Sequence, residues 1–66
     1  MTAILKRGSR GAAVRDLQTW LSKALVQPIH VDSDFGEATE GAVRAFQALA
    51  GLVVDGRAAP QTIAAL

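Results

Sequence analysis

The feature that most constrains this chain is its similarity to itself at two fixed offsets. At an offset of 23 residues, V-D-S (31–33) falls on V-D-G (54–56), and Thr39 falls on Thr62. At an offset of 29 residues, V-R-D-L-Q (14–18) falls on V-R-A-F-Q (43–47). Repeats of this kind are typical of folds in which small units stack on one another. We therefore predict that one turn and one helix segment each occur twice.

Residues 31–47 carry both repeated segments, and we predict that they form a polar turn followed by a helix. The second copy locates the start of that helix. Pro60 suits the first position of a helix, because an N–H would have no partner there. Ala59 is then the cap residue, and Gly36 is its counterpart at the offset of 23. Gly51 is expected to end the helix in a left-handed turn.

Apolar residues recur at three- and four-residue steps in three segments, which predicts three helices. The first covers about 12–25 and ends at Gln27-Pro28, the second runs from Gly36 to 50, and the third begins at Pro60. The residues expected to face inward are Val14, Leu17, Leu21 and either Ala24 or Leu25; Ala42, Val43, Phe46, Leu49 and Ala50; Ile63 and Leu66; and, from the connections, Ile29, Val31 and 52–54. The predicted fold class is all-α, a compact three-helix bundle with a repeated turn-helix unit.

The length and composition fit one small domain over residues 1–66. With no cysteine and one histidine, neither a disulfide nor a structural zinc site can hold it together, so helix packing has to do so. No apolar stretch approaches the roughly 18 residues that a membrane span needs. The opening MTAILKRGSRG has an apolar run too short for an export signal. We therefore expect a soluble domain made without a signal peptide.

Charge is unevenly distributed along the chain. Residues 1–23 hold five basic side chains and one acidic one, whereas residues 24–66 hold two basic and five acidic ones. This asymmetry fits either a partner with acidic groups near the first helix or simply solvated helix faces. A net charge of +1 argues against a nucleic-acid-binding surface, which needs many basic contacts to phosphate.

The carboxylates of the central turn do not match a catalytic or metal-binding pattern. Asp32, Asp34 and Gly36 resemble the start of a calcium loop, but the glycine comes one place early and the twelfth position is Val43, not glutamate. A chain this short has little material to form the cleft that a pair of catalytic carboxylates needs, and His30 is the sole candidate base. We expect no catalysis, no metal and no cofactor; the aspartates are expected to bond nearby backbone amides and hold the turn.

Three segments together resemble the peptidoglycan-binding domain family of the three-helix type: L-K-R-G-S-R-G-A-A-V-R-D-L-Q (5–18), 31–47, and G-L-V-V-D-G-R-A-A-P-Q-T-I-A-A-L (51–66). This resemblance implies a three-helix fold, no catalysis by the domain itself, and affinity for the bacterial cell wall. The chain departs from the family pattern at Ala59, where glycine is usual, and at Ser33, where the family usually has glycine after the aspartate.

The resemblance also implies a biological setting. Because Met1 opens the domain directly, we expect the N-terminal targeting module of a phage or prophage endolysin, followed by a catalytic domain after residue 66. Such a protein is made in the cytoplasm and acts at the wall, in the periplasm, after its release. The expected partner is peptidoglycan, through its glycan strand and stem peptide, with no nucleic acid and no membrane involved, and the module is expected to be a monomer.

Ligand contacts are expected where polar groups gather near the two turns and beside the first helix. The predicted ligand-binding residues are Gln18, Trp20, Asp34, Phe35, Arg44, Gln47 and Arg57. Arginine and glutamine suit stem-peptide carboxylates and sugar hydroxyls, and an aromatic ring suits the apolar face of a sugar. Trp20 has two possible roles, since it could lie at the edge of the core or form a partly exposed platform for stacking.

The competing function is a protein-interaction module without affinity for the wall. It would dock a neighbouring domain through exposed apolar side chains, for instance Ala48, Val53 and Ala58.

Overall fold

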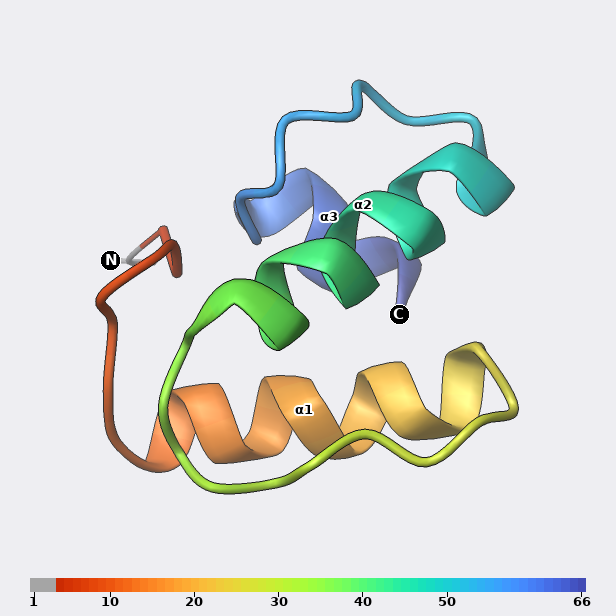
Figure 1. Cartoon of the computed structure of the whole chain (residues 1–66). Helices are drawn as coiled ribbons and strands as arrows, with labels where there is room; N and C mark the ends of the chain where they lie inside the picture. Colours follow the sequence, from red (N-terminus) through yellow and green to blue (C-terminus); the bar gives the residue numbers. More distant parts are fainter. Residues whose placement is uncertain (1–3) are drawn as a thin grey trace.

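The computed structural model describes residues 4–66, which form three helices without a strand (Figure 1). Helix α1 spans Ala12–Ala24, α2 spans Glu37–Ala50 and α3 spans Pro60–Ala65. The predicted all-α, three-helix fold is confirmed. Met1, on which the expected N-terminal position was based, lies outside the described residues, as does the rest of 1–3. None of the helices in residues 4–66 has the length and apolarity that crossing a membrane requires.

The predicted helix starts agree with the structure. Gly36 caps α2, Ala59 caps α3, and Pro60 is the first residue of α3. Gly51 ends α2 with a φ of 73°, and the N–H of Leu52 donates to the carbonyl of Gln47 at 2.9 Å. This left-handed ending places the unpaired carbonyls of the last turn within reach of donors.

Helix α1 agrees to within one residue with the predicted range of about 12–25, and Gln27-Pro28 lies beyond its end. Its last residue is Ala24, Leu25 follows as the cap, and Val26 takes a left-handed conformation with a φ of 52°. The returning chain is then held to the helix, because the N–H of Ile29 donates to Ser22 Oγ at 3.2 Å. A β-branched residue is costly in the left-handed region, so the sequence did not predict the positive φ of Val26.

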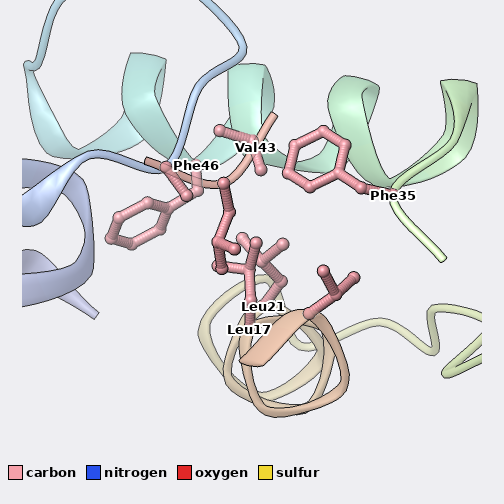
Figure 2. Close-up of a cluster of buried hydrophobic side chains, with 8 residues drawn as sticks. Leu17, Leu21, Phe35, Val43 and Phe46 are labelled. Atoms are coloured by element: carbon pink, nitrogen blue, oxygen red, sulfur yellow. The ribbon is translucent and has the colours of Figure 1, made fainter. Parts of the chain in front are cut away.

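The core lies between α1, α2 and the two turns (Figure 2). Its buried apolar side chains come from α1, α2, the start of the chain and the turns: Val14, Leu17, Leu21, Val43, Phe46, Leu5, Phe35 and Ala58. Leu25, not Ala24, continues the inward face of α1, and Ile29, Ala42, Leu52, Ile63 and Leu66 pack against the core as predicted.

Two inward-facing predictions on α2 are wrong. Leu49 is 75% exposed, and Ala50 is exposed at the end of the helix. The buried face of α2 includes Gln47, which is 1% exposed. At 100° per residue, Leu49 lies about 160° around the helix from Gln47, so burying the glutamine turns the leucine outward. A search for apolar periodicity alone could not find a buried face that contains a polar residue.

Three connection residues predicted to face inward are also exposed. Val31 is 44% exposed, and Val53 and Val54 are 74% and 51% exposed. After Leu52 the chain leaves the core and arcs away from α2 before it returns to α3 (Figure 1). Ile29 and Leu52 therefore supply the apolar anchor of each connection, and the valines beyond them meet solvent.

Candidate functional site

The first turn, residues 32–34, is built around the side chain of Gln18. Its amide nitrogen donates to Asp32 Oδ1 at 3.0 Å, to the carbonyl of Asp34 at 3.1 Å and to Thr39 Oγ1 at 2.9 Å. Its oxygen accepts from the N–H groups of Asp32 and Ser33, at 3.1 and 3.0 Å. The side chain of Gln18 on α1 thus bonds both to this loop and to Thr39 at the start of helix α2.

The second turn, residues 55–57, has the same hydrogen-bond network around the side chain of Gln47. Its amide nitrogen donates to Asp55 Oδ1 at 3.0 Å, to the carbonyl of Arg57 at 2.9 Å and to Thr62 Oγ1 at 3.1 Å. Its oxygen accepts from the N–H groups of Asp55 and Gly56, at 3.1 and 3.0 Å. The predicted turn-helix repeat is therefore a repeated hydrogen-bond network, which we call the glutamine clamp.

The two sequence offsets follow from the lengths of the two connections. Gln18 and Asp32 are 14 residues apart, whereas Gln47 and Asp55 are 8 apart, a difference of six. Six is also the difference between the offsets of 29 and 23. The extra residues form the end of α1 and the connection that runs back along it (Figure 1).

Three of the seven predicted ligand-binding residues lie inside the protein. Gln18, Phe35 and Gln47 are 0%, 1% and 1% exposed, and the clamps occupy the donors and acceptors of both glutamine amides. The structure gives these three side chains a supporting role, and a ligand on the surface would meet other groups. For the two glutamines the signal was present in the repeat, because Gln, Asp and Thr recur at both sites.

The remaining predicted residues form two groups and one separate position. Asp34 belongs to the first turn, and Arg44 and Arg57 belong to the second. Trp20 is 42% exposed on α1. It follows Gln18 by two residues, as Leu49 follows Gln47, so the buried glutamine turns each of these apolar side chains toward solvent. The interpretation of Trp20 as a partly exposed ring fits this position.

The aspartate of each turn is held as a carboxylate. The side chain of Gln18, followed by the N–H of Asp34, lowers the pKa of Asp32 below its ordinary value. At the second turn the N–H of Arg57, followed by the side chain of Gln47, lowers the pKa of Asp55. Hydrogen bonds favour the charged form of a carboxyl group. The prediction that an aspartate bonds nearby backbone amides is confirmed for Asp32, whose Oδ1 accepts from the N–H of Asp34 at 3.0 Å.

The charge asymmetry of the sequence is partly cancelled in the fold. Arg7 pairs with Glu40 at 3.1 Å, and Arg10 pairs with Asp34 at 3.1 Å. Both pairs join the basic first third of the chain to the acidic remainder, and both are exposed, so they contribute little to stability. The hydrogen bond and charge of Asp34 raise the pKa of Arg10. The basic segment is therefore a weaker anionic-ligand surface than its composition indicated.

The charged side chains of the described residues form no metal site. Among residues 4–66, no three His, Cys, Asp or Glu side chains gather in a way that could hold an ion. Asp32, the residue that most resembled a calcium ligand, has one of its oxygens engaged by Gln18 and by the N–H of Asp34.

Comparison with known proteins places the fold in a family. A model described as "Putative peptidoglycan binding domain" matches residues 10–66. The chain belongs to this peptidoglycan-binding domain family. Within it, the chain is 42% identical over 60 residues to the zinc D-Ala-D-Ala carboxypeptidase of Streptomyces albus G, a match covering 88% of the chain and 24% of the enzyme. The chain thus spans about a quarter of that relative.

Two solved structures of similar proteins share the peptidoglycan-binding domain fold. The N-terminal domain of SleB superposes with a TM-score of 0.90 at 36% identity, covering 97% of this chain and 88% of that one. The endolysin of Burkholderia phage AP3 superposes with a TM-score of 0.84 at 47% identity, covering 91% of this chain and 23% of the endolysin. Domains of this fold thus occur both in a carboxypeptidase and in a phage endolysin.

Proposed function

We propose that this chain is a non-catalytic module that binds the peptidoglycan of the bacterial cell wall and brings an attached wall hydrolase to its substrate. The observation that carries the proposal is the family match over residues 10–66. The names of two similar proteins support the attached activity, since one is a carboxypeptidase and the other an endolysin. In this proposal residues 1–66 form one monomeric folding unit, and the module acts at the wall, in the periplasm, after its release.

The proposed binding surface uses the predicted residues that are exposed or half-buried: Trp20, Asp34, Arg44 and Arg57. A partly exposed indole can stack on the apolar face of a sugar. Arginine and aspartate can bond the carboxylates and amides of a stem peptide. The clamp glutamines contribute indirectly, because they fix the backbone of the turns that carry Asp34 and Arg57.

A docking module without wall affinity is the second candidate, and exposed apolar side chains favour it. Leu49 and Val53 are 75% and 74% exposed, and Ala48, the residue before Leu49, is also exposed. We also expected Ala58 on such a surface, and this prediction is wrong. Ala58 is 0% exposed, and its backbone pairs with that of Leu5, so it belongs to the core.

Co-sedimentation with purified sacculi tests the proposed function. The folded chain should sediment with sacculi at low salt. Part of the binding should be lost as sodium chloride rises, because exposed charges are screened within about 8 Å at physiological ionic strength. Binding through stacking and sugar hydrogen bonds should persist. If the folded chain stays in the supernatant at every salt concentration, wall binding is wrong and the docking module takes its place.

The contribution of Trp20 is separated from general loss of apolar surface by a matched pair of variants. Trp20→Ala and Leu49→Ala each remove an exposed apolar side chain two residues after a clamp glutamine. The first should weaken sedimentation, and the second should not. If Trp20→Ala and Leu49→Ala sediment with sacculi to the same extent, Trp20 is not part of the binding site, although wall binding itself stands.

A further inference from the structure

The arginines of this chain fall into two classes by their ion pairs. Three of the five are paired: Arg7 with Glu40, Arg10 with Asp34, and Arg15 with Asp16 at 3.8 Å. Among the described residues, Arg44 and Arg57 are in no ion pair. Both are exposed, and both belong to the second turn-helix unit. The arginines that form no ion pair therefore both lie in the second unit, where the charge of Arg57 also helps to lower the pKa of Asp55.

Gly56 brings Arg44 onto that turn. A β-carbon at Gly56 would lie 3.0 Å from Arg44 Nε and 3.0 Å from Glu40 Cγ. The glycine is buried beneath these two side chains, whereas Arg44 itself is exposed. The missing side chain thus lets the guanidinium end of Arg44 lie against the turn backbone. Arg57 is the next residue, so its Cα is about 3.8 Å from that of Gly56, and two unpaired arginines share one turn.

The first turn lacks this arrangement although its clamp is the same. At the offset of 29, the counterpart of Arg44 is Arg15, which pairs with Asp16. At the offset of 23, the counterpart of Gly56 is Ser33, which carries a side chain. The first turn also has its own ion pair, between Arg10 and Asp34. An anion arriving at the first turn would have to compete with carboxylates that these arginines already hold.

We propose that the second turn is the point at which this module binds a free carboxylate of the peptidoglycan stem peptide, with Arg44 and Arg57 as the contact residues. The inference rests on the proposed function and names the chemical group that this part of the surface takes. Arginine presents parallel N–H donors that match the two oxygens of a carboxylate. Asp55 and Glu40 lie beside the site, and Arg7 pairs with the latter. These three arginines and two carboxylates leave one positive charge, which suits a single carboxylate.

The test uses sacculi stripped of phosphate-containing polymers, so that carboxylates are the anions presented by the wall. One batch is left native, and in the other the stem-peptide carboxyl groups are converted to neutral amides by carbodiimide coupling to methylamine. Wild type, Arg44→Gln, Arg57→Gln and Arg15→Gln are compared by co-sedimentation after circular dichroism shows that each is folded. Arg15→Gln is the matched control, since it removes the equivalent arginine from the first unit.

Amidation should weaken wild-type binding by about two- to fivefold, the range for an exposed ion pair. Arg44→Gln and Arg57→Gln should each lose a similar factor on native sacculi and lose little more on amidated ones. Arg15→Gln should match wild type on both. A purely structural role for either arginine would reduce binding equally on the two batches, which would contradict the proposal.

Two further outcomes separate this inference from the function on which it rests. If wild type binds native and amidated sacculi equally well, or if Arg15→Gln loses as much as Arg44→Gln, the carboxylate site is wrong and wall binding stands. If wild type sediments with neither batch, the proposed function fails, and the carboxylate site fails with it.

Discussion

At the first turn, Ser33 takes the left-handed conformation with a φ of 65° and Asp34 pairs with Arg10; at the second turn, Gly56 takes it with a φ of 74° and Arg44 lies across it. Beneath these differences, Gln18 and Gln47 make the same set of hydrogen bonds. The shared glutamines are buried, whereas the charged side chains that differ, Arg44 and Asp34, are exposed or half-buried. The comparison therefore separates what holds the fold from what can meet a ligand.

The largest expected effect is the loss of either clamp. Gln18→Leu or Gln47→Leu leaves two backbone N–H groups without an acceptor and removes the donor to a buried threonine hydroxyl. Each buried group left unsatisfied costs about 1 to 3 kcal/mol. We expect a loss of about 3 to 5 kcal/mol in the free energy of unfolding, which would unfold much of so small a domain. Urea unfolding followed by circular dichroism measures it.

Two exposed glutamines provide the controls for the clamp variants. Gln27→Leu and Gln61→Leu make the same chemical change on the surface, where the effect should stay within about 0.5 kcal/mol. Should one clamp variant cost no more than its control, the two turns would not be held in the same way, and the equivalence of the two units would be lost.

Acid should weaken both turns together. The pKa values of Asp32 and Asp55 are lower in the folded chain than their ordinary values. Their stabilising effect is therefore complete above the unfolded pKa of about 3.9, and it is lost as the pH falls through the lower folded values. Melting temperatures measured from pH 6 down to pH 2 should drop most steeply at the acid end of this range.

Single substitutions divide the acid effect between the turns. Asp32→Asn and Asp55→Asn should each reduce the fall in melting temperature between pH 6 and pH 2, and the double variant should reduce it further. Asp16→Asn, a change on the exposed surface of α1, serves as the control. If the melting temperature of the double variant falls as steeply with acid as that of wild type, the clamped carboxylates do not cause the acid effect.

A smaller effect is expected from Gly56→Ala. The substitution forces an L side chain into the left-handed region, at a cost of about 1 to 2 kcal/mol, and its β-carbon meets Arg44 and Glu40 at 3.0 Å. Gly41→Ala makes the same change inside α2, where nothing lies within 4 Å, and should stabilise by about 0.5 to 1 kcal/mol. Thermal melts of the two variants should move in opposite directions. A melt of Gly56→Ala at or above that of wild type would contradict the account of the second turn.

The smallest expected change in stability comes from a substitution in the first turn. Ser33→Gly gives the first turn the residue that the second turn has, and it relieves the left-handed conformation at Ser33. The gain is partly offset by the greater freedom of glycine in the unfolded chain, so we expect about 0.5 kcal/mol of stabilisation. Chemical unfolding can resolve this against wild type. A loss of stability would mean that the serine side chain contributes to the turn.

The fold could be predicted because the repeat, the caps and the apolar periodicity are local features of the chain. Pro60 fixed the third helix start and, through the offset, the second. The position of the buried face was harder to predict. Gln47 is as buried as the core hydrophobics, and a polar residue counts against burial until its partners are known. Leu49 was placed inside for that reason.

The candidate site was less predictable than the fold, because it depends on pairings across the structure. Arg7 and Arg10 looked available in the sequence, but their partners Glu40 and Asp34 lie 33 and 24 residues further along. The neighbourhood of Arg44 and Gly56 likewise exists only after folding. The repeat did show which glutamine, aspartate and threonine residues belong together, although not that their side chains bond one another.

The most direct test of the account is a chemical-shift titration of the ¹⁵N-labelled chain with soluble muropeptides that carry free stem-peptide carboxylates. The method detects weak binding residue by residue, so it compares the two turns in a single experiment. We expect the amide resonances of Asp55, Gly56 and Arg57 to show the largest saturable shifts, and those of Asp32, Ser33 and Asp34 to move less. Saturable shifts confined to the first turn, or no shifts at either turn, would contradict the account.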